Sequence, residues 1–317
     1  MTGAQTIVVT GVNGFIAGHL VKKVCRTYPD ALVIGVGRQA HRQGISELAN
    51  LEYVSADLCD SGALTRLPEK ADTVIHFAGD RRSFVPSGEY SDQIRTNILA
   101  TSQLADYAIR ARASRFLFAS SVYVYSGCAN IPFREDFTEH PRENLGVSKF
   151  GAEAVLNARS CAGHFSSTSF RIFTTYGPGA SQDQFLSAAI QKLLSPEPVA
   201  AFGNPEMRRD FVYVDDVVDA VMKSLQMDAG GMGIIGNKAL NIGSGKATSI
   251  RDVVTMLAEI LNVTKPIEFD VDAFPAREGD NCHQADLTKI GDCLGWTPNT
   301  SLDEGLQKLV LSLDGSS

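Results

Sequence analysis

Short apolar runs that are rich in β-branched residues alternate with longer amphipathic segments over the first half of the chain. Runs of this kind predict strands whose two faces are both buried, and the segments between them predict helices. The alternation therefore predicts a parallel sheet of about six or seven strands with helices on both faces. The expected strands cover residues 6–10, 31–36, 51–56, 73–78, 115–121 and 167–173, and the clearest helices cover residues 14–26, 92–112 and 148–162.

The alternation weakens after residue 179, where the segments become shorter and more mixed. Helices are expected there near residues 182–194, 215–227, 249–262 and 301–313. We therefore expect a Rossmann-like, doubly wound parallel sheet over residues 1–175 and a smaller C-terminal α/β lobe over residues 176–317. Some segments of the second part are expected to return to the main sheet.

Composition narrows the class of protein. The 317 residues are 44% hydrophobic and 21% charged, and the formal charge is -7 without any long basic run. Binding to nucleic acid is not expected, because such surfaces concentrate positive charge. No apolar run reaches membrane-spanning length, and the six scattered cysteines form no pair spaced for zinc. These features predict a cytoplasmic protein with reduced thiols, no metal and no membrane partner.

The first expected strand runs into the stretch TGVNGFIAGHL, which places three glycines before an apolar helix. Glycines at this spacing allow a tight turn, a close approach of backbone N–H groups to a pyrophosphate, and close contact between helix and sheet. We expect a dinucleotide to bind here, because the start of a helix also favours an anion. The alternative is a glycine-rich turn without a ligand. The expected contacts in this stretch are Gly11, Asn13, Gly14, Phe15, Ile16 and Gly18.

The end of the second expected strand bears on the choice between NAD and NADP. An acidic residue here ordinarily accepts hydrogen bonds from the adenosine ribose, but in this chain Gly37 is followed by Arg38. A guanidinium suits a 2′-phosphate, so NADP is favoured and NAD stays possible. At the end of the third strand, Asp57 and Leu58 are candidates for a contact with the adenine edge, with a helix N-cap as the alternative.

Together these motifs resemble those of the extended short-chain dehydrogenase/reductase family, particularly its nucleotide-sugar epimerases, dehydratases and 4-ketoreductases. The resemblance extends over nearly the whole chain, and the motifs follow one another in the family's order. They are TGVNGFIAG, HFAG (76–79), Asn97 in RTNILAT, ASSVYVYSG (119–127), SKFGAE (148–153), RIFTTYGPG (171–179), RRDFVYVDDVVDAV (208–221), LNIGSG (240–245) and REGD (277–280).

The resemblance implies a nicotinamide cofactor across the strand ends, with Phe77 and Ala78 among its contacts. It also implies a nucleoside diphosphate sugar bound mainly by the C-terminal lobe, with Arg209 and Arg277 as anchors of the diphosphate. That role suits bidentate guanidinium chemistry. Tyr176 is a candidate for lining the sugar pocket, and a structural role in the turn is an equal alternative.

Catalysis in this family uses a serine or threonine, a tyrosine and a lysine. Ser121 matches the serine, and Lys149 matches the lysine, which by resemblance also hydrogen-bonds the nicotinamide ribose. The tyrosine position, four residues before the lysine, holds Leu145, which can neither give nor take a proton. Loss of a general acid typically costs a factor of about 10²–10⁴ in rate. Thr174 is a second departure, because relatives that act on sugar nucleotides commonly have an asparagine there.

A reaction that survives Leu145 needs a replacement proton donor. Tyr123 is favoured over Tyr125, because the resemblance makes Tyr125 a structural residue of the turn. The full set of candidates is Ser121, a water held by Ser121 and Lys149, Tyr123, Tyr125, Glu143 and His140.

Two functions remain open at this point. The first is an NAD(P)-dependent nucleotide-sugar oxidoreductase, an epimerase or a 4-ketoreductase, with a substituted proton donor. The second is a non-catalytic relative that binds dinucleotide or nucleotide sugar as a sensor or assembly partner. The retained serine, lysine and arginines favour the enzyme, because they serve both cofactor and substrate. By resemblance the chain also forms a homodimer through the helices near 92–112 and 148–162.

Overall fold

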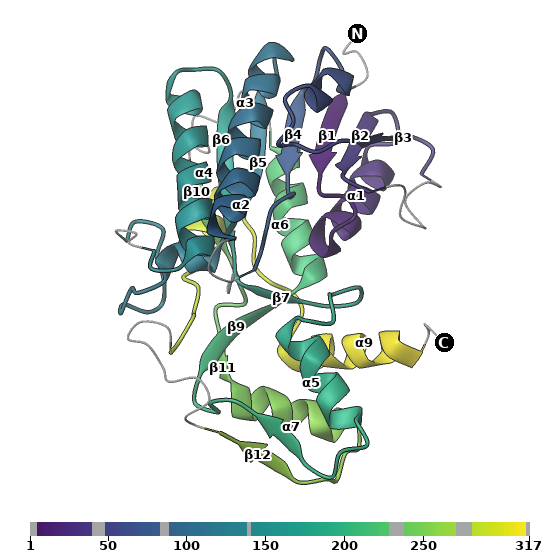
Figure 1. Cartoon of the computed structure of the whole chain (residues 1–317), viewed down its shortest axis with the longest axis vertical. Helices are drawn as coiled ribbons and strands as arrows, with labels where there is room; N and C mark the ends of the chain where they lie inside the picture. The colour runs from purple at the N-terminus through teal and green to yellow at the C-terminus, as the bar shows by residue number, and fades with distance from the viewer. Residues whose placement is uncertain are drawn as a thin grey trace.

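A seven-stranded parallel sheet forms the centre of the protein, in the order β10-β6-β5-β4-β1-β2-β3 (Figure 1). This parallel sheet confirms the predicted Rossmann-like fold. The computed structural model describes residues 5–39, 48–82, 89–137, 141–227, 238–270 and 281–314. The strands of this sheet are β1 (Thr6–Thr10), β2 (Leu32–Gly37), β3 (Leu51–Ser55), β4 (Thr73–His76), β5 (Arg115–Ser121), β6 (Ser166–Ile172) and β10 (Lys238–Ile242).

The strand order reverses between β1 and β4, which are neighbours in the sheet although two strands separate them in the chain. In open parallel sheets the crevice beyond the carboxyl ends at such a reversal is where ligands bind. β10 comes from the second half of the chain and pairs with β6, as expected for segments that return to the main sheet. The fold therefore predicts a ligand site at the lower edge of the sheet in Figure 1.

Helices cover both faces of the sheet, because each face carries its own cluster of buried apolar side chains. One face packs against α1, α6 and α8, and the other packs against α3 and α4. These helices are α1 (Phe15–Thr27), α6 (Val214–Gln226), α8 (Thr288–Leu294), α3 (Ala100–Arg110) and α4 (Asn144–Cys161); α2 (Tyr90–Ile94) precedes α3, and short 3₁₀ turns lie at η1 (Ala63–Arg66) and η3 (Val122–Tyr125).

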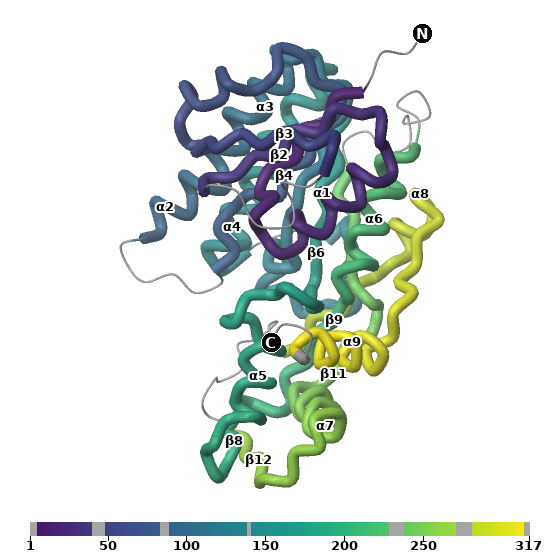
Figure 2. The backbone as a smooth tube through the Cα atoms, turned by 90° about the vertical axis from the view of Figure 1, so that its right-hand side faces the viewer, coloured from purple at the N-terminus to yellow at the C-terminus, as the bar shows by residue number. Residues whose placement is uncertain are grey.

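The smaller lobe lies beyond the carboxyl ends of the strands and has a separate apolar core (Figure 2). It contains a three-stranded sheet in the order β11-β9-β7 and a two-stranded sheet of β8 and β12. Its elements are β7 (Thr174–Tyr176), α5 (Phe185–Leu194), β8 (Ala200–Phe202), β9 (Arg208–Tyr213), β11 (Ala247–Ser249), α7 (Ile250–Ile260), β12 (Ile267–Phe269) and α9 (Leu302–Asp314).

Two expected helices differ from the observed ones. The single helix expected at 92–112 contains a π-helical turn, η2 (Arg95–Leu99), between α2 and α3. The helix expected at 148–162 begins at Asn144, so Leu145 lies in its first turn. Gly146 permits this early start, because a Cβ at that position would collide with the Tyr123 carbonyl. Both differences depend on contacts between distant segments.

Candidate functional site

The turn from β1 into α1 has the form of an anion cradle. Gly11 has φ +77°, and a Cβ there would lie 2.6 Å from the backbone nitrogen of Ala78, so only glycine fits without displacing the end of β4. The Gly14 N–H donates to the Gly11 carbonyl at 2.7 Å, and α1 begins at the next residue. The N–H groups of the first turn of α1 are therefore available to an anion. This geometry fits a dinucleotide pyrophosphate, as predicted from the glycines.

The other residues expected in this stretch surround the same turn. Gly18 is buried, and its N–H donates to the Gly14 carbonyl at 2.9 Å. Phe15 and Ile16 pack partly against the core of the smaller lobe. Asn13 donates a hydrogen bond from Nδ2 to the Tyr53 hydroxyl at 2.9 Å. The start of α1 thus contacts both parts of the protein.

At the ends of β2 and β3 no carboxylate occupies the position after Val36. A Cβ at Gly37 would lie 2.7 Å from the Tyr53 hydroxyl, so a larger residue there would displace that ring. Arg38 is exposed beside this position. Asp57 caps the backbone, since its Oδ1 accepts the Cys59 N–H at 2.9 Å. Leu58 is 6% exposed and packs in the apolar core, so its contact with adenine stays a prediction.

The Lys149 amine and Ser121 both lie at the end of β5. The Lys149 Nζ donates to the Ala119 carbonyl at 2.8 Å and lies 4.8 Å from the centre of the Phe118 ring. Ser121 is the last residue of β5, and its Oγ accepts the Tyr123 N–H at 3.3 Å. The structure therefore brings the predicted serine and lysine to the same strand end. They lie at the edge of the sheet that also carries the glycine turn.

Burial governs the ionisation of the basic groups near this strand end. Removal of the Lys149 amine from water lowers its pKa to about 8, although the carboxylates of Glu153 and Asp80 partly oppose this shift. His76 lies behind the amine, between the hydroxyls of Thr10 (2.7 Å) and Thr101 (2.9 Å). Burial, followed by the charge of Lys149, lowers the pKa of His76 to about 3. His76 is therefore a neutral core residue.

Leu145, which the resemblance places at the tyrosine position, is a buried apolar side chain, 3% exposed, in the first turn of α4. Tyr123 is partly buried, and its ring packs edge-on against His283 with 5.9 Å between ring centres. Tyr125 is 1% exposed and donates from its hydroxyl to Asn241 Oδ1 at 2.8 Å, which agrees with the structural role expected of it. His140 lies outside the described residues.

A buried polar network extends from α4 to the strands behind the lysine. Glu153 forms an ion pair with Arg171 at 2.8 Å, and the two side chains are 10% and 3% exposed. The Glu153 carboxylate also accepts the Ser120 hydroxyl. Arg171 donates to the Tyr125 hydroxyl at 2.9 Å. The sequence analysis did not identify this network, although Glu153 and Arg171 each end or begin a quoted motif.

Asn97 positions the segment after β4, a role that the sequence analysis did not assign to it. It is 1% exposed within the π-helical turn, and its side-chain amide accepts the Asp80 N–H at 2.7 Å and donates to the Asp80 carbonyl at 2.8 Å. Its Nδ2 also donates to the Ser148 hydroxyl at 2.9 Å. These bonds hold the segment after β4 against α4, next to Lys149. π-helical turns occur frequently at functional sites.

The residues expected to contact the sugar nucleotide have different surroundings. Arg209 lies on β9, is partly exposed, and donates to the neighbouring Arg208 carbonyl at 2.8 Å. Tyr176 is 2% exposed in the core of the smaller lobe, where its hydroxyl donates to the Leu302 carbonyl at 3.4 Å. This burial agrees with the structural alternative for Tyr176, and the sugar contact stays a prediction. Arg277 lies outside the described residues.

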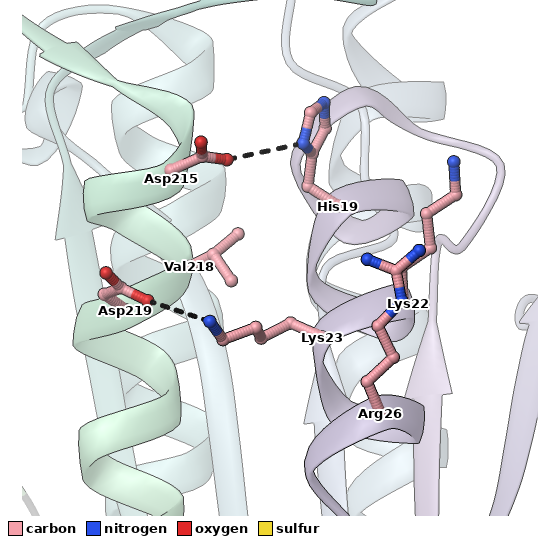
Figure 3. A pocket seen from close by; sticks show the side chains of 7 residues that line it. All are labelled: His19, Lys22, Lys23, Arg26, Asp215, Val218 and Asp219. Carbon is pink, nitrogen blue, oxygen red and sulfur yellow. Dashed lines mark ion pairs between the residues drawn. The ribbon is translucent and has the colours of Figure 1, made fainter.

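Two polar contacts, Arg81 with Asp183 and His19 with Pro178, join the sheet domain to the smaller lobe. Arg81, after β4, forms an exposed ion pair with Asp183, before α5, at 2.7 Å. Nε2 of His19 on α1 lies 2.9 Å from the Pro178 carbonyl. Its Nδ1 lies 3.6 Å from the Asp215 carboxylate on α6 (Figure 3). Since both ring nitrogens face acceptors, the imidazolium form of His19 satisfies both contacts.

His19 should make stability depend on pH. Its contact with Asp215 raises the pKa of His19 above the ordinary 6.5. A raised folded-state pKa stabilises the protein fully below the unfolded pKa, and this contribution is lost as pH rises through the folded pKa. We expect His19→Gln to lower the free energy of unfolding at pH 5.5 by up to about 1 kcal/mol, because the His19–Asp215 pair is partly exposed. At pH 8.5 the same variant should change the free energy of unfolding very little. Urea denaturation at both pH values measures this, with His164→Gln at an exposed site as the control.

The described part of the chain contains no helix long and apolar enough to cross a membrane. Within the same residues, no group of three or more His, Cys, Asp or Glu side chains is arranged to hold a metal ion. The six cysteines form no disulfide. The residues gathered at the strand ends are thus the candidates for the chemistry.

Comparisons with known proteins identify relatives over almost the full chain. The pattern of the NAD dependent epimerase/dehydratase family matches residues 7–243. The chain is 26% identical to dTDP-D-glucose 4,6-dehydratase of Mus musculus, over 97% of this chain and 88% of that protein. It is 28% identical to UDP-glucose 4-epimerase of Azospirillum brasilense, over 98% of this chain and 92% of that protein.

Solved structures extend this similarity to the whole fold. MoeE5 in complex with UDP-glucuronic acid and NAD is 30% identical, with a TM-score of 0.85 over 98% of this chain and 100% of that chain. UDP-glucose 4-epimerase of Thermotoga maritima, solved with UDP-glucose, is 27% identical, with a TM-score of 0.86 over 98% of this chain and 99% of that chain.

Proposed function

The chain belongs to the NAD dependent epimerase/dehydratase family, and on this premise we propose that it is an NAD(P)-dependent nucleotide-sugar oxidoreductase of the epimerase or 4-ketoreductase type. The observation that carries the proposal is that the Lys149 amine and Ser121 lie at the sheet edge that also carries the glycine turn. Reaction at the sugar C4 is the part of the proposal that rests on the family's chemistry.

A nicotinamide dinucleotide fits the turn at Gly11, and when bound it supplies the group that accepts and returns the hydride of sugar C4. The first turn of α1 holds its pyrophosphate in this proposal, and Lys149 holds the nicotinamide ribose. The solved relatives named above include one with NAD. The missing carboxylate at Gly37 and the exposed Arg38 support NADP as well. Denaturing the purified protein and identifying the released dinucleotide distinguishes the two.

The proposed substrate is a nucleoside diphosphate sugar. The two solved relatives contain UDP-glucuronic acid and UDP-glucose, respectively. Arg209 and Arg277 are the proposed diphosphate anchors, because guanidinium groups bind diphosphate oxygens in a bidentate manner. Arg209 lies on β9 of the smaller lobe, and its charge acts on His283, whose ring packs against Tyr123, which supports its assignment.

The proton of the sugar O4 is handled in this proposal by a group other than a tyrosine on α4. Ser121 and Tyr123 are the hydroxyls proposed to contact the sugar. The backbone N–H of Tyr123 donates to Ser121 Oγ, so the turn that carries Tyr123 starts at the strand end that carries Ser121. A correctly placed hydroxyl positions the reacting oxygen and relays its proton.

Turnover with defined sugar nucleotides tests the proposal. The purified chain, supplied with NAD or NADP, should interconvert UDP-sugars at C4 or oxidise NADPH with a nucleotide-linked 4-ketosugar. Ser121→Ala should reduce turnover by about 10²-fold or more, since it removes the hydroxyl at the reacting oxygen. Ser160→Ala, at the far end of α4, is the matched control and should leave turnover unchanged.

A non-catalytic relative that binds dinucleotide or nucleotide sugar is the second candidate function, because Leu145 replaces the family tyrosine. It predicts retained binding of the dinucleotide with no turnover across the panel. Under this alternative, Leu145→Tyr should create a large gain of turnover. That pair of results would contradict the active-enzyme proposal.

We also propose that the chain forms a homodimer through α2, the π-helical turn and α4, which pack side by side (Figure 1). Large apolar side chains are exposed on this surface: Tyr90 (45%), Ile94 (38%), Leu99 (44%), Val147 (41%) and Phe150 (37%). Sedimentation velocity should give twice the 34.1 kDa of one chain. Phe150→Glu should shift the species to the monomer, whereas Leu311→Glu, on exposed α9, should not.

A further inference from the structure

Given the proposed function, one group in the site must hold the O4 proton while the sugar is a ketone. Leu145 cannot hold it, and the nearby hydroxyls are weak acids, since tyrosine has an ordinary pKa of about 10 and serine is weaker still. A hydroxyl can relay a proton. Holding one near neutral pH requires a group that ionises close to the working pH.

The Lys149 amine lies at the strand end that carries Ser121. Nζ donates to the carbonyl of Ala119, two residues before Ser121 on β5. Positions two apart on a strand face the same side and are about 7 Å apart. The amine also lies beside the end of β4, because a Cβ at Gly79 would lie 3.2 Å from Nζ. The amine therefore lies at the strand end that carries Ser121, about two residues away along β5.

The amine is desolvated and has no close counter-ion. Lys149 is 7% exposed, and among the described residues no carboxylate oxygen lies within 4.0 Å of its Nζ. Glu153 is one helical turn further along α4, but its carboxylate is held by Arg171 at 2.8 Å and by the Ser120 hydroxyl. The network behind the lysine thus takes up the carboxylate that could otherwise pair with it.

Charged and titratable groups face Lys149 from three directions. Glu153 lies on the same helix, Asp80 lies after β4, and His76 lies on β4 as a neutral ring. The two carboxylates favour the ammonium, and burial opposes it more strongly, so the pKa of Lys149 falls to about 8. Both the amine and the ammonium are then populated near neutral pH.

We infer that Lys149 is the acid–base group of the proposed reaction, taking the sugar O4 proton through the Ser121 hydroxyl as a neutral amine and returning it as an ammonium. In the oxidation, the Ser121 hydroxyl accepts the O4 proton and passes its own proton to Nζ. The C4–H bond breaks at the same time, and its electron pair leaves with the hydrogen to the dinucleotide oxidant. The sugar has then lost two electrons and two hydrogens and is a 4-ketone, and the ammonium reverses the proton path when C4 is reduced.

Titration of the lysine side chain tests the inference without any turnover. The protein is prepared with [ε-¹³C]lysine, and the Lys149 resonance is assigned by its absence from Lys149→Met. We expect the Lys149 resonance to titrate near pH 8, whereas exposed lysines titrate near their ordinary pKa of about 10.4. A Lys149 that titrates above pH 10 overturns the inference.

Chemical rescue tests the same role in the reaction. Lys149→Met and Lys149→Arg should both lose about 10²–10⁴-fold in turnover, because methionine holds no proton and arginine stays charged at all working pH values. Added methylamine or ethylamine should restore Lys149→Met at least about tenfold. Lys22→Met, an exposed site on α1, should keep full turnover and show no response to amines.

The outcomes separate the inference from the proposed function. Turnover by the wild-type chain, together with an active Lys149→Arg or a Lys149→Met that amines do not restore, overturns the inference and leaves the function standing. No turnover by the wild-type chain across the sugar panel overturns both. If Lys149→Met fails to fold, the arginine variant and its turnover take its place.

Discussion

Gly11→Ala is expected to raise the dissociation constant of the dinucleotide by about 5- to 140-fold. The residue has φ +77°, and the new Cβ would lie 2.6 Å from the Ala78 nitrogen and 2.8 Å from the Phe77 carbonyl carbon. Both obstacles are backbone atoms, so the turn must move away from β4. A strained backbone costs about 1–3 kcal/mol, and each 1.4 kcal/mol of lost binding energy is about tenfold in affinity. Calorimetric titration with NAD and NADP measures the change.

Gly163→Ala is the matched control for backbone strain alone. Gly163 has φ +81°, but nothing lies within 4 Å of a Cβ built there, and it follows the end of α4. The variant should lower stability by about 1 kcal/mol and leave dinucleotide affinity unchanged. Equal losses of affinity in the two variants would show that general strain, and not the cradle, decides binding.

Glu153→Gln is expected to lower the free energy of unfolding by about 3–5 kcal/mol. The substitution keeps the size of the side chain but leaves the Arg171 guanidinium without its ion-pair partner, and that guanidinium is 3% exposed. A buried guanidinium that loses the Glu153 carboxylate cannot be compensated by water. Urea denaturation followed by circular dichroism measures the loss.

Two further variants show whether the buried charge is the cause. Glu206→Gln breaks an exposed ion pair with Arg251, at 3.2 Å, and should change stability by less than about 1 kcal/mol. Adding Arg171→Met to Glu153→Gln removes the unpaired charge and should recover part of the loss. A loss below about 1 kcal/mol in Glu153→Gln itself would contradict the account of the network.

Local patterns were sufficient to predict the architecture. Apolar runs such as residues 6–10 and 115–121 coincide with β1 and β5, because a strand buried on both faces needs a continuous apolar sequence. The glycine turn was predictable for a similar reason, since the conformation of Gly11 is a property of a few consecutive residues. Ser121 and Lys149 were identified from motifs and then found at one strand end.

Burial was the property that the patterns predicted least well. Tyr176 and Leu58 looked like site residues, but the packing of distant segments places both in apolar cores. The start of α4 at Asn144 depends on its contact with η3, and the π-helical turn accompanies the bonds of Asn97 to Asp80 and Ser148. None of these partners is adjacent in the chain.

The sequence by itself determined the parallel sheet, the glycine turn and the presence of Leu145 four residues before Lys149, because each depends on residues that are close together in the chain. Only the tertiary structure decided how Lys149 ionises. Its amine is withdrawn from water by β4 and β5, and Arg171 on β6 holds the carboxylate of Glu153. Desolvation and ion pairing depend on the distances between distant segments, so they follow from the fold and not from the order of the residues.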